Sequence, residues 1–144
     1  MSVFCDSSAL VKLYADEHES NTIRSLAEFV VSQLARVEIP AALWRKRRTG
    51  ELSFQRASVL AQEFEWDWSG ERRGAGRFAV VGLTGEILES ASHALAVHPL
   101  RASDAIQLAS ALAARAADPG LVEFACFDDR LVTAARAEGF RPIP

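Results

Sequence analysis

Two short apolar segments of this chain each end in an aspartate at the point where a helical pattern begins. Val3–Cys5 stops at Asp6, and Val122–Phe127 stops at Asp128. A strand that is followed by a helix reaches its next parallel neighbour through a crossover, and such crossovers place helices on the faces of the sheet. The alternation of strand and helix therefore predicts an α/β fold with a mainly parallel central sheet.

The same alternation continues through the whole chain. Short apolar runs bounded by turn residues predict strands at 3–5, 29–31, 78–83 and 122–127. Apolar residues that recur every three or four positions predict helices directly after Asp6, at 20–29, 34–48, 53–68, 84–96 and 101–117, and around 131–135. Ser20 is expected to cap the second helix, and Pro40 to kink the third helix or to mark its first turn. The sequence thus predicts one domain, residues 1–144, built as a three-layer α/β/α sandwich.

The composition limits the class of protein. With 144 residues and 49% hydrophobic content, the chain can bury one continuous core. No apolar run approaches the roughly 20 residues that cross a bilayer, and the N-terminus lacks the pattern of an export signal, so we expect a cytoplasmic protein with no membrane partner. The two cysteines, Cys5 and Cys126, are expected to be buried, reduced thiols. The formal charge of −3 argues against a general nucleic-acid binder, unless several acids hold metal.

Four acidic residues lie at the starts of predicted helices. Asp6 and Asp128 follow strands, at the edge of the sheet where open α/β folds bind ligands. Asp104 lies in the first turn of a long helix, and Glu38 lies early in another. Carboxylates that share a crevice repel one another unless a cation holds them, and hard cations such as Mg²⁺ or Mn²⁺ prefer oxygen ligands. Such ions activate water against phosphodiesters, so the four acids predict a metal-dependent phosphodiesterase.

Each acid taken alone also has a simpler explanation. Asp104 and Asp128 are well placed to cap a helix or to stabilise its N-terminus, and Glu38 can be a solvated surface acid. Asp129 directly follows Asp128 and is a rival for its role. Arg101 can pair with Asp104 one turn along the same helix.

Segments around these acids resemble the PIN domain family, and more closely the VapC-type toxins of bacterial toxin–antitoxin pairs. The resemblance lies in the opening segment Phe4–Tyr14 (FCDSSALVKLY), the central segment Leu100–Ala109 (LRASDAIQLA) and the closing segment Phe127–Leu131 (FDDRL). Ser32–Glu38 matches through its strand, its serine and its later acid. In the closing segment the family's acid stands three residues before the leucine, which selects Asp128 over its neighbour.

The resemblance implies a PIN-like fold and an endoribonuclease that uses Mg²⁺ or Mn²⁺. It implies that Asp6, Glu38, Asp104 and Asp128 bind the metal and carry the catalysis, and that Ser8 supplies a supporting hydroxyl. It also implies an RNA substrate, a cognate antitoxin that holds the toxin inactive, and a homodimer.

The densest basic run of the chain ends the helix 34–48 and consists of Arg45, Lys46, Arg47 and Arg48. These side chains can contact RNA phosphates, although cations at the C-terminal end of a helix are also favoured by the helix dipole.

Two other functions stay open from the residues alone. One is a non-catalytic PIN-like binding module, against which the presence of all four acids argues. The other is an aspartate-based phosphoryl-transfer protein of similar architecture. That chemistry needs a second acid close to Asp6 or a well-placed lysine, and the chain has only Lys12 and Lys46.

Overall fold

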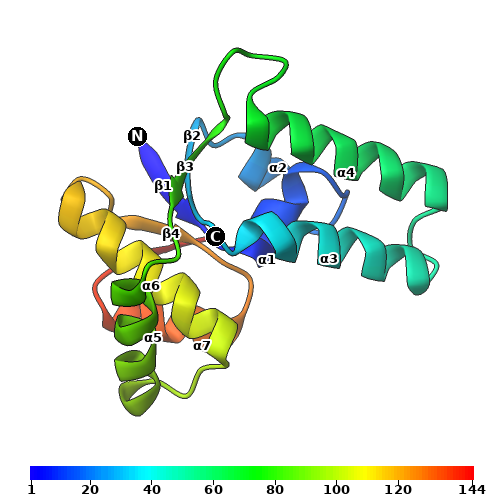
Figure 1. Cartoon of the computed structure of the whole chain (residues 1–144). Helices are drawn as coiled ribbons and strands as arrows, with labels where there is room; N and C mark the ends of the chain where they lie inside the picture. The colour runs from blue at the N-terminus through cyan, green and yellow to red at the C-terminus, as the bar shows by residue number, and fades with distance from the viewer.

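A five-stranded parallel sheet forms the centre of the computed structural model, which describes all 144 residues (Figure 1). The strands are β1 (Ser2–Cys5), β2 (Glu28–Ser32), β3 (Phe78–Val81), β4 (Glu123–Ala125) and β5 (Arg141–Ile143). Their order in the sheet is β3-β2-β1-β4-β5, and every neighbouring pair is parallel. The predicted α/β fold with a mainly parallel sheet is therefore confirmed.

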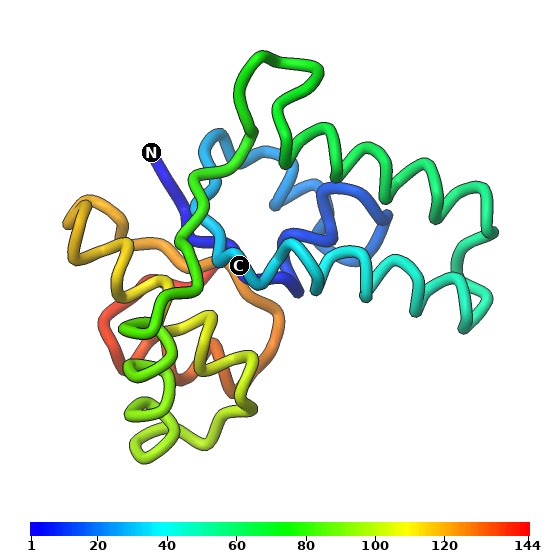
Figure 2. Tube along the Cα trace, viewed as in Figure 1, coloured from blue at the N-terminus to red at the C-terminus, as the bar shows by residue number.

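Helices lie on both faces of this sheet. They are α1 (Ser7–Leu10), α2 (Ser20–Arg24), α3 (Ala35–Arg48), α4 (Phe54–Ser69), α5 (Gly85–Val97), α6 (Ala102–Ala117) and α7 (Asp129–Ala137), with a 3₁₀ turn at Val11–Leu13. The trace shows the antiparallel pair α3 and α4 extending away from the sheet on one side, while α5, α6 and α7 gather on the other (Figure 2). None of these helices is both long enough and apolar enough to span a bilayer.

The alternation of side chains along β1 explains the two cores. Val3 and Cys5 point to the face covered by α1 to α4, where they pack with residues such as Leu60 and Phe64. Phe4 points to the opposite face and joins the core beneath α6 and α7. Because consecutive residues of a buried central strand pack into two different cores, the strand is apolar from Val3 to Cys5.

Two local predictions are corrected, and one strand was missed. The helix predicted at 20–29 ends at Arg24, because Phe29 belongs to β2 and stacks edge-on against Phe78 of the neighbouring strand. Ser20 is not the cap: Glu19, with a left-handed φ of 64°, precedes the helix, and the hydroxyl of Ser20 accepts a hydrogen bond from the backbone of Glu17 instead. The fifth strand was not predicted, since three residues around Pro142 carry almost no strand signal.

Pro40 does not mark the first turn of its helix, which was one of the two alternatives predicted for it. It lies inside α3, beyond the first turn, which is occupied by Glu38 among others. A proline there removes one backbone donor from the helix. The first turn of α3 nevertheless forms, and this places Glu38 at the edge of the sheet where the strands end.

Candidate active site

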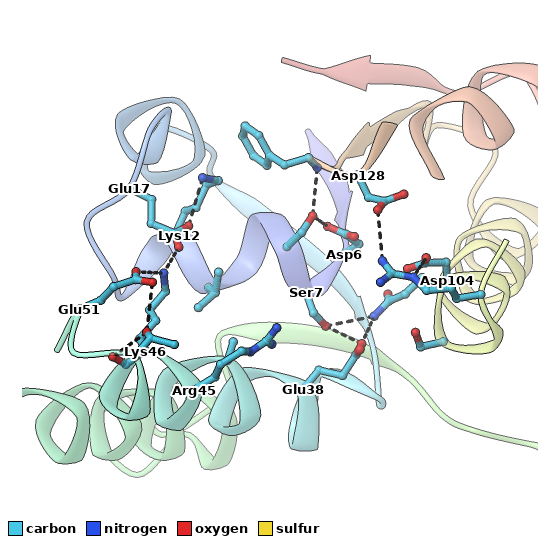
Figure 3. A pocket seen from close by; sticks show the side chains of 18 residues that line it. Asp6, Ser7, Lys12, Glu17, Glu38, Arg45, Lys46, Glu51, Asp104 and Asp128 are labelled. Atoms are coloured by element: carbon cyan, nitrogen blue, oxygen red, sulfur yellow. Dashed lines mark hydrogen bonds and ion pairs between the residues drawn. The ribbon is translucent and has the colours of Figure 1, made fainter. Parts of the chain in front are cut away.

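A pocket of about 550 Å³ opens at the carboxyl ends of β1 and β4, where four helices begin. All four acids predicted from the sequence line this pocket: Asp6, Glu38, Asp104 and Asp128. Figure 3 shows that they come from four different elements and gather at one end of it. The pocket therefore brings together residues from nearly the full length of the chain.

Asp6 is the most deeply buried of the four, with 3% of its surface exposed. It caps α1: its Oδ1 accepts hydrogen bonds from the backbone N of Ala9 at 3.0 Å and from the hydroxyl of Ser8 at 2.7 Å. The thiol of Cys126 donates to the other oxygen, Oδ2, at 3.3 Å. Burial raises the pKa of Asp6 to about 6, against the effect of these hydrogen bonds, and the nearby charge of Asp104 adds to the rise.

Ser8 lies where the sequence resemblance places a supporting hydroxyl. Besides donating to Asp6, its Oγ accepts a hydrogen bond from the backbone N of Phe127 at 3.0 Å. Cys126 makes a parallel link, because its sulfur donates to Asp6 and accepts from the backbone N of Asp128 at 3.3 Å. The ends of β1 and β4 are thus tied together beside the buried carboxylate.

Glu38 is half-buried and is held from two sides. Its Oε1 accepts hydrogen bonds from the hydroxyl of Ser7 at 2.9 Å and from the side-chain amide of Gln107 at 2.8 Å. Gln107 lies one turn after Asp104 on α6 and is 2% exposed, and its own Oε1 has no hydrogen-bond partner. Glu38 is therefore a positioned side chain rather than a freely solvated acid.

Asp104 and Asp128 share one positively charged partner, the side chain of Arg101. Arg101 donates from Nε to Oδ2 of Asp104 at 3.1 Å and from a terminal nitrogen to Oδ2 of Asp128 at 3.2 Å. Asp128 also caps α7, since its Oδ1 accepts from the backbone N of Leu131 at 3.0 Å. The capping explanation and the pocket role are therefore both true of this residue. Asp129 is exposed and does not line the pocket.

The family of the chain follows from a comparison with known proteins. The PIN domain model matches residues 3–137, which is nearly the whole chain. The chain belongs to the PIN domain family. Ribonuclease VapC45 and ribonuclease VapC49, from two strains of Mycobacterium tuberculosis, are each 36% identical to it over 146 residues, covering 99% of this chain and 94% of theirs. The resemblance to VapC-type PIN domains is thus confirmed.

A solved structure supports the fold of this PIN domain independently. The crystal structure of Mycobacterium tuberculosis VapC20, described as a sarcin-ricin loop cleaving toxin, superposes with a TM-score of 0.62. The match covers 96% of both chains at 19% sequence identity. At that identity the likeness establishes the three-layer fold.

Only the first half of the basic run Arg45–Arg48 reaches the pocket of this PIN domain. Arg45 and Lys46 line it, whereas Arg47 and Arg48 do not. Lys46 is ion-paired with Glu17 and, at 3.1 Å, with Glu51. Arg45 has no ion-pair partner, and Figure 3 shows it between the acids and the paired lysine.

A cluster of ion pairs closes the far end of the pocket: Lys12, Glu17, Lys46 and Glu51. The buried ammonium group of Lys12 contacts Glu17 at 3.1 Å and lies 4.2 Å from the centre of the Phe127 ring. Burial opposes the ionisation of Glu17, but the hydrogen bonds from the two lysines prevail and lower its pKa. We call these four residues the ion-pair cluster.

The donor atoms at the acidic end suit a hard cation. They are carboxylate oxygens and serine hydroxyls, the ligand type that Mg²⁺ and Mn²⁺ prefer. No three acidic, histidine or cysteine side chains converge on one point closely enough to hold an ion as they stand. Each acid is instead engaged by a protein donor, so these side chains would have to move closer together to bind a cation.

Several residues of the site were missed from the sequence. Gln107, Ser7 and Cys126 hold the acids in place, and each is a residue type that is common in helices or cores. One signal was available for Cys126, because it lies only two positions before Asp128 in the sequence.

Proposed function

We propose that this chain is a metal-dependent endoribonuclease that cleaves RNA phosphodiester bonds, and that it is the toxin of a toxin–antitoxin pair. The observation that carries the proposal is the convergence of four carboxylates from four elements in one pocket of a PIN domain. The names of the curated relatives, which are ribonucleases of the VapC type, support it.

Asp6, Glu38, Asp104 and Asp128 are the proposed ligands of Mg²⁺ or Mn²⁺. A bound ion of this kind supplies an activated water and stabilises the charge that develops on the phosphate. The protein contributes fixed positions for the acids. Ser8 and Cys126 hold Asp6, while Ser7 and Gln107 hold Glu38, and such supporting contacts orient ligands that would otherwise rotate.

Arg45 is the proposed contact to the RNA backbone outside the acidic end. It is exposed, has no carboxylate partner and lines the same pocket. Lys46 is held by the ion-pair cluster and orders that end of the pocket rather than contributing a free charge. The contact of Arg47 and Arg48 with RNA stays a prediction. Because they lie outside the pocket, only an RNA that extends beyond it could reach them.

The biological assembly is part of the same proposal. Toxins of this type act in the cytoplasm, form homodimers and are held inactive by a cognate antitoxin, as the resemblance implies. Co-expression with the protein encoded by the adjacent reading frame, followed by size-exclusion chromatography with light scattering, tests both partners. A monomer that does not bind the protein encoded by the adjacent reading frame contradicts the proposed assembly. This result would not bear on the nuclease activity, which is tested separately.

Cleavage of defined RNAs tests the activity. Wild-type protein is assayed with Mg²⁺ or Mn²⁺ and with EDTA, beside Asp6→Asn and Asp104→Asn. We expect cleavage only with the metal and a loss of at least about 100-fold in each variant. Asp129→Asn is the matched control, because this acid is adjacent to the site but exposed. Unchanged cleavage in both site variants contradicts the mechanism, and no cleavage by the wild type favours a non-catalytic module.

A further inference from the structure

Arg101 lies across two of the acids that line the pocket. It directly precedes α6, and its guanidinium contacts Oδ2 of Asp104 at 3.1 Å and Oδ2 of Asp128 at 3.2 Å. These acids belong to different elements, one to the first turn of α6 and the other to the cap of α7. One guanidinium therefore bridges two carboxylates that the fold, and not the local sequence, brings together.

In Asp128, the oxygen that Arg101 contacts is the one that a cation would use most readily. Oδ1 of Asp128 is engaged by the backbone N of Leu131 at 3.0 Å, which leaves Oδ2 as the oxygen without a backbone partner. A divalent ion bound by Asp104 and Asp128 would compete with the guanidinium for these carboxylates. The two positive groups would also repel each other, so we expect binding of the ion to release the guanidinium.

The released side chain stays at the pocket. Arg101 lines it, and 71% of its side chain is exposed, so little packing fixes its conformation. A guanidinium presents a planar fork of donors that matches the oxygens of a phosphate. Lys12 and Lys46, which also line the pocket, are already paired with Glu17 and are not free to take this role.

We propose that Arg101 is a substrate-binding residue with two positions. Before the divalent cation binds, its guanidinium bridges Asp104 and Asp128. When the cation takes these carboxylates, the guanidinium swings free and binds a phosphate of the RNA. The proposal rests on the function proposed above, because that RNA is its substrate, and it sets an order of binding in which the metal precedes productive RNA contact.

Mn²⁺ binding without RNA tests the first position. The signal of free Mn²⁺ in electron paramagnetic resonance titrations gives a Kd for wild type, Arg101→Ala and Arg45→Ala. Arg45 is the matched control, because it lines the same pocket without a carboxylate partner, so its loss removes the same charge but frees no ligand. We expect Arg101→Ala to bind Mn²⁺ at least about fivefold more tightly than Arg45→Ala, as removal of a competitor requires. An equal Kd in the two variants overturns the proposal.

Steady-state cleavage tests the second position. With saturating Mn²⁺ and a fluorophore–quencher RNA of mixed sequence, we expect Arg101→Ala to raise the apparent KM about tenfold, with kcat changed by less than about threefold. Arg101→Lys keeps the charge and is expected to restore part of the KM. A purely structural role does not tighten Mn²⁺ binding while weakening RNA binding. An unchanged KM overturns the proposal.

The outcomes separate this inference from the function on which it rests. If neither wild type nor Arg101→Ala binds Mn²⁺ and RNA cleavage persists in EDTA, the metal-dependent function fails, and the role of Arg101 fails with it. If wild type binds Mn²⁺ and cleaves RNA, but Arg101→Ala matches Arg45→Ala in its Kd, only the role of Arg101 is overturned.

Discussion

The side-chain amide of Gln107 donates a hydrogen bond of 2.8 Å to Glu38, across 69 residues of sequence and from one helix to another. Gln107 is buried, and its remaining oxygen has no partner. A buried acceptor without a partner costs folding free energy, so this side chain does not lie here for its contribution to stability. The main effect of the contact is therefore to hold Glu38 in position.

Replacing Gln107 by methionine tests this contact. The substitution keeps the volume but removes the donor, and we expect RNA cleavage to fall by about 10–100-fold, the usual effect of losing a group that orients a metal ligand. The melting temperature is expected to stay within a few degrees, because the unpartnered oxygen is lost as well. Gln62→Met, on the exposed side of α4, is the control. Full activity in Gln107→Met contradicts the positioning role.

The two roles of Asp128 can be separated by two substitutions. Asparagine also caps helices, whereas alanine does not, so urea denaturation in EDTA should find Asp128→Ala less stable than Asp128→Asn by about 0.5–2 kcal/mol. Both variants are expected to lose RNA cleavage. Equal stability of the two variants shows that the bond to Leu131, at 3.0 Å, contributes little to folding.

The ion-pair cluster predicts a loss of stability in acid. The folded state lowers the pKa of Glu17 below its ordinary value of 4.5, so ionised Glu17 stabilises the fold above that value. This contribution is lost as the pH falls through the lowered pKa. Urea denaturation should show Glu17→Gln to be less stable than wild type at neutral pH, with the difference closing in acid. A difference that does not depend on pH contradicts this origin.

Both thiols are expected to be inert in the native protein. Cys5 and Cys126 are buried, and burial is the main cause that raises the pKa of each well above that of a free thiol, with the charge of Asp6 adding to it. The thiolate is the reactive form, so a disulfide-exchange reagent at mildly alkaline pH should label neither cysteine until urea is added. Rapid labelling of Cys126 in the folded protein contradicts its place beside Asp6.

The sequence predicts those parts of the site that depend on the succession of strands and helices along the chain. Asp6 and Asp128 could be located because each ends an apolar strand before a helix, and parallel strands end at one edge. The partners of the acids could not, because Gln107 meets Glu38 only after two distant helices have packed on the sheet. Arg101 is an intermediate case: its contact with Asp104 follows from helix spacing, while its contact with Asp128 depends on tertiary packing.

The failures of local prediction have the same physical cause. The residues from Ser20 to Phe29 carry a helical pattern, but the helix ends at Arg24, and Phe29 packs against Phe78 in the sheet. Pro142 removes the strand signal from the sequence of β5, although this segment adds a strand at the edge of the sheet, beside β4. Tertiary burial thus overrides local preference where the two conflict.

The hydrogen bond from the backbone of Phe127 to the hydroxyl of Ser8 joins residues 119 positions apart. Ser8 follows β1 and Phe127 follows β4, so this contact forms only when the two strands pair in the sheet. A partly folded state in which β4 has left the sheet lacks the contact beside Asp6. The four acids are therefore held together only in the fully folded domain.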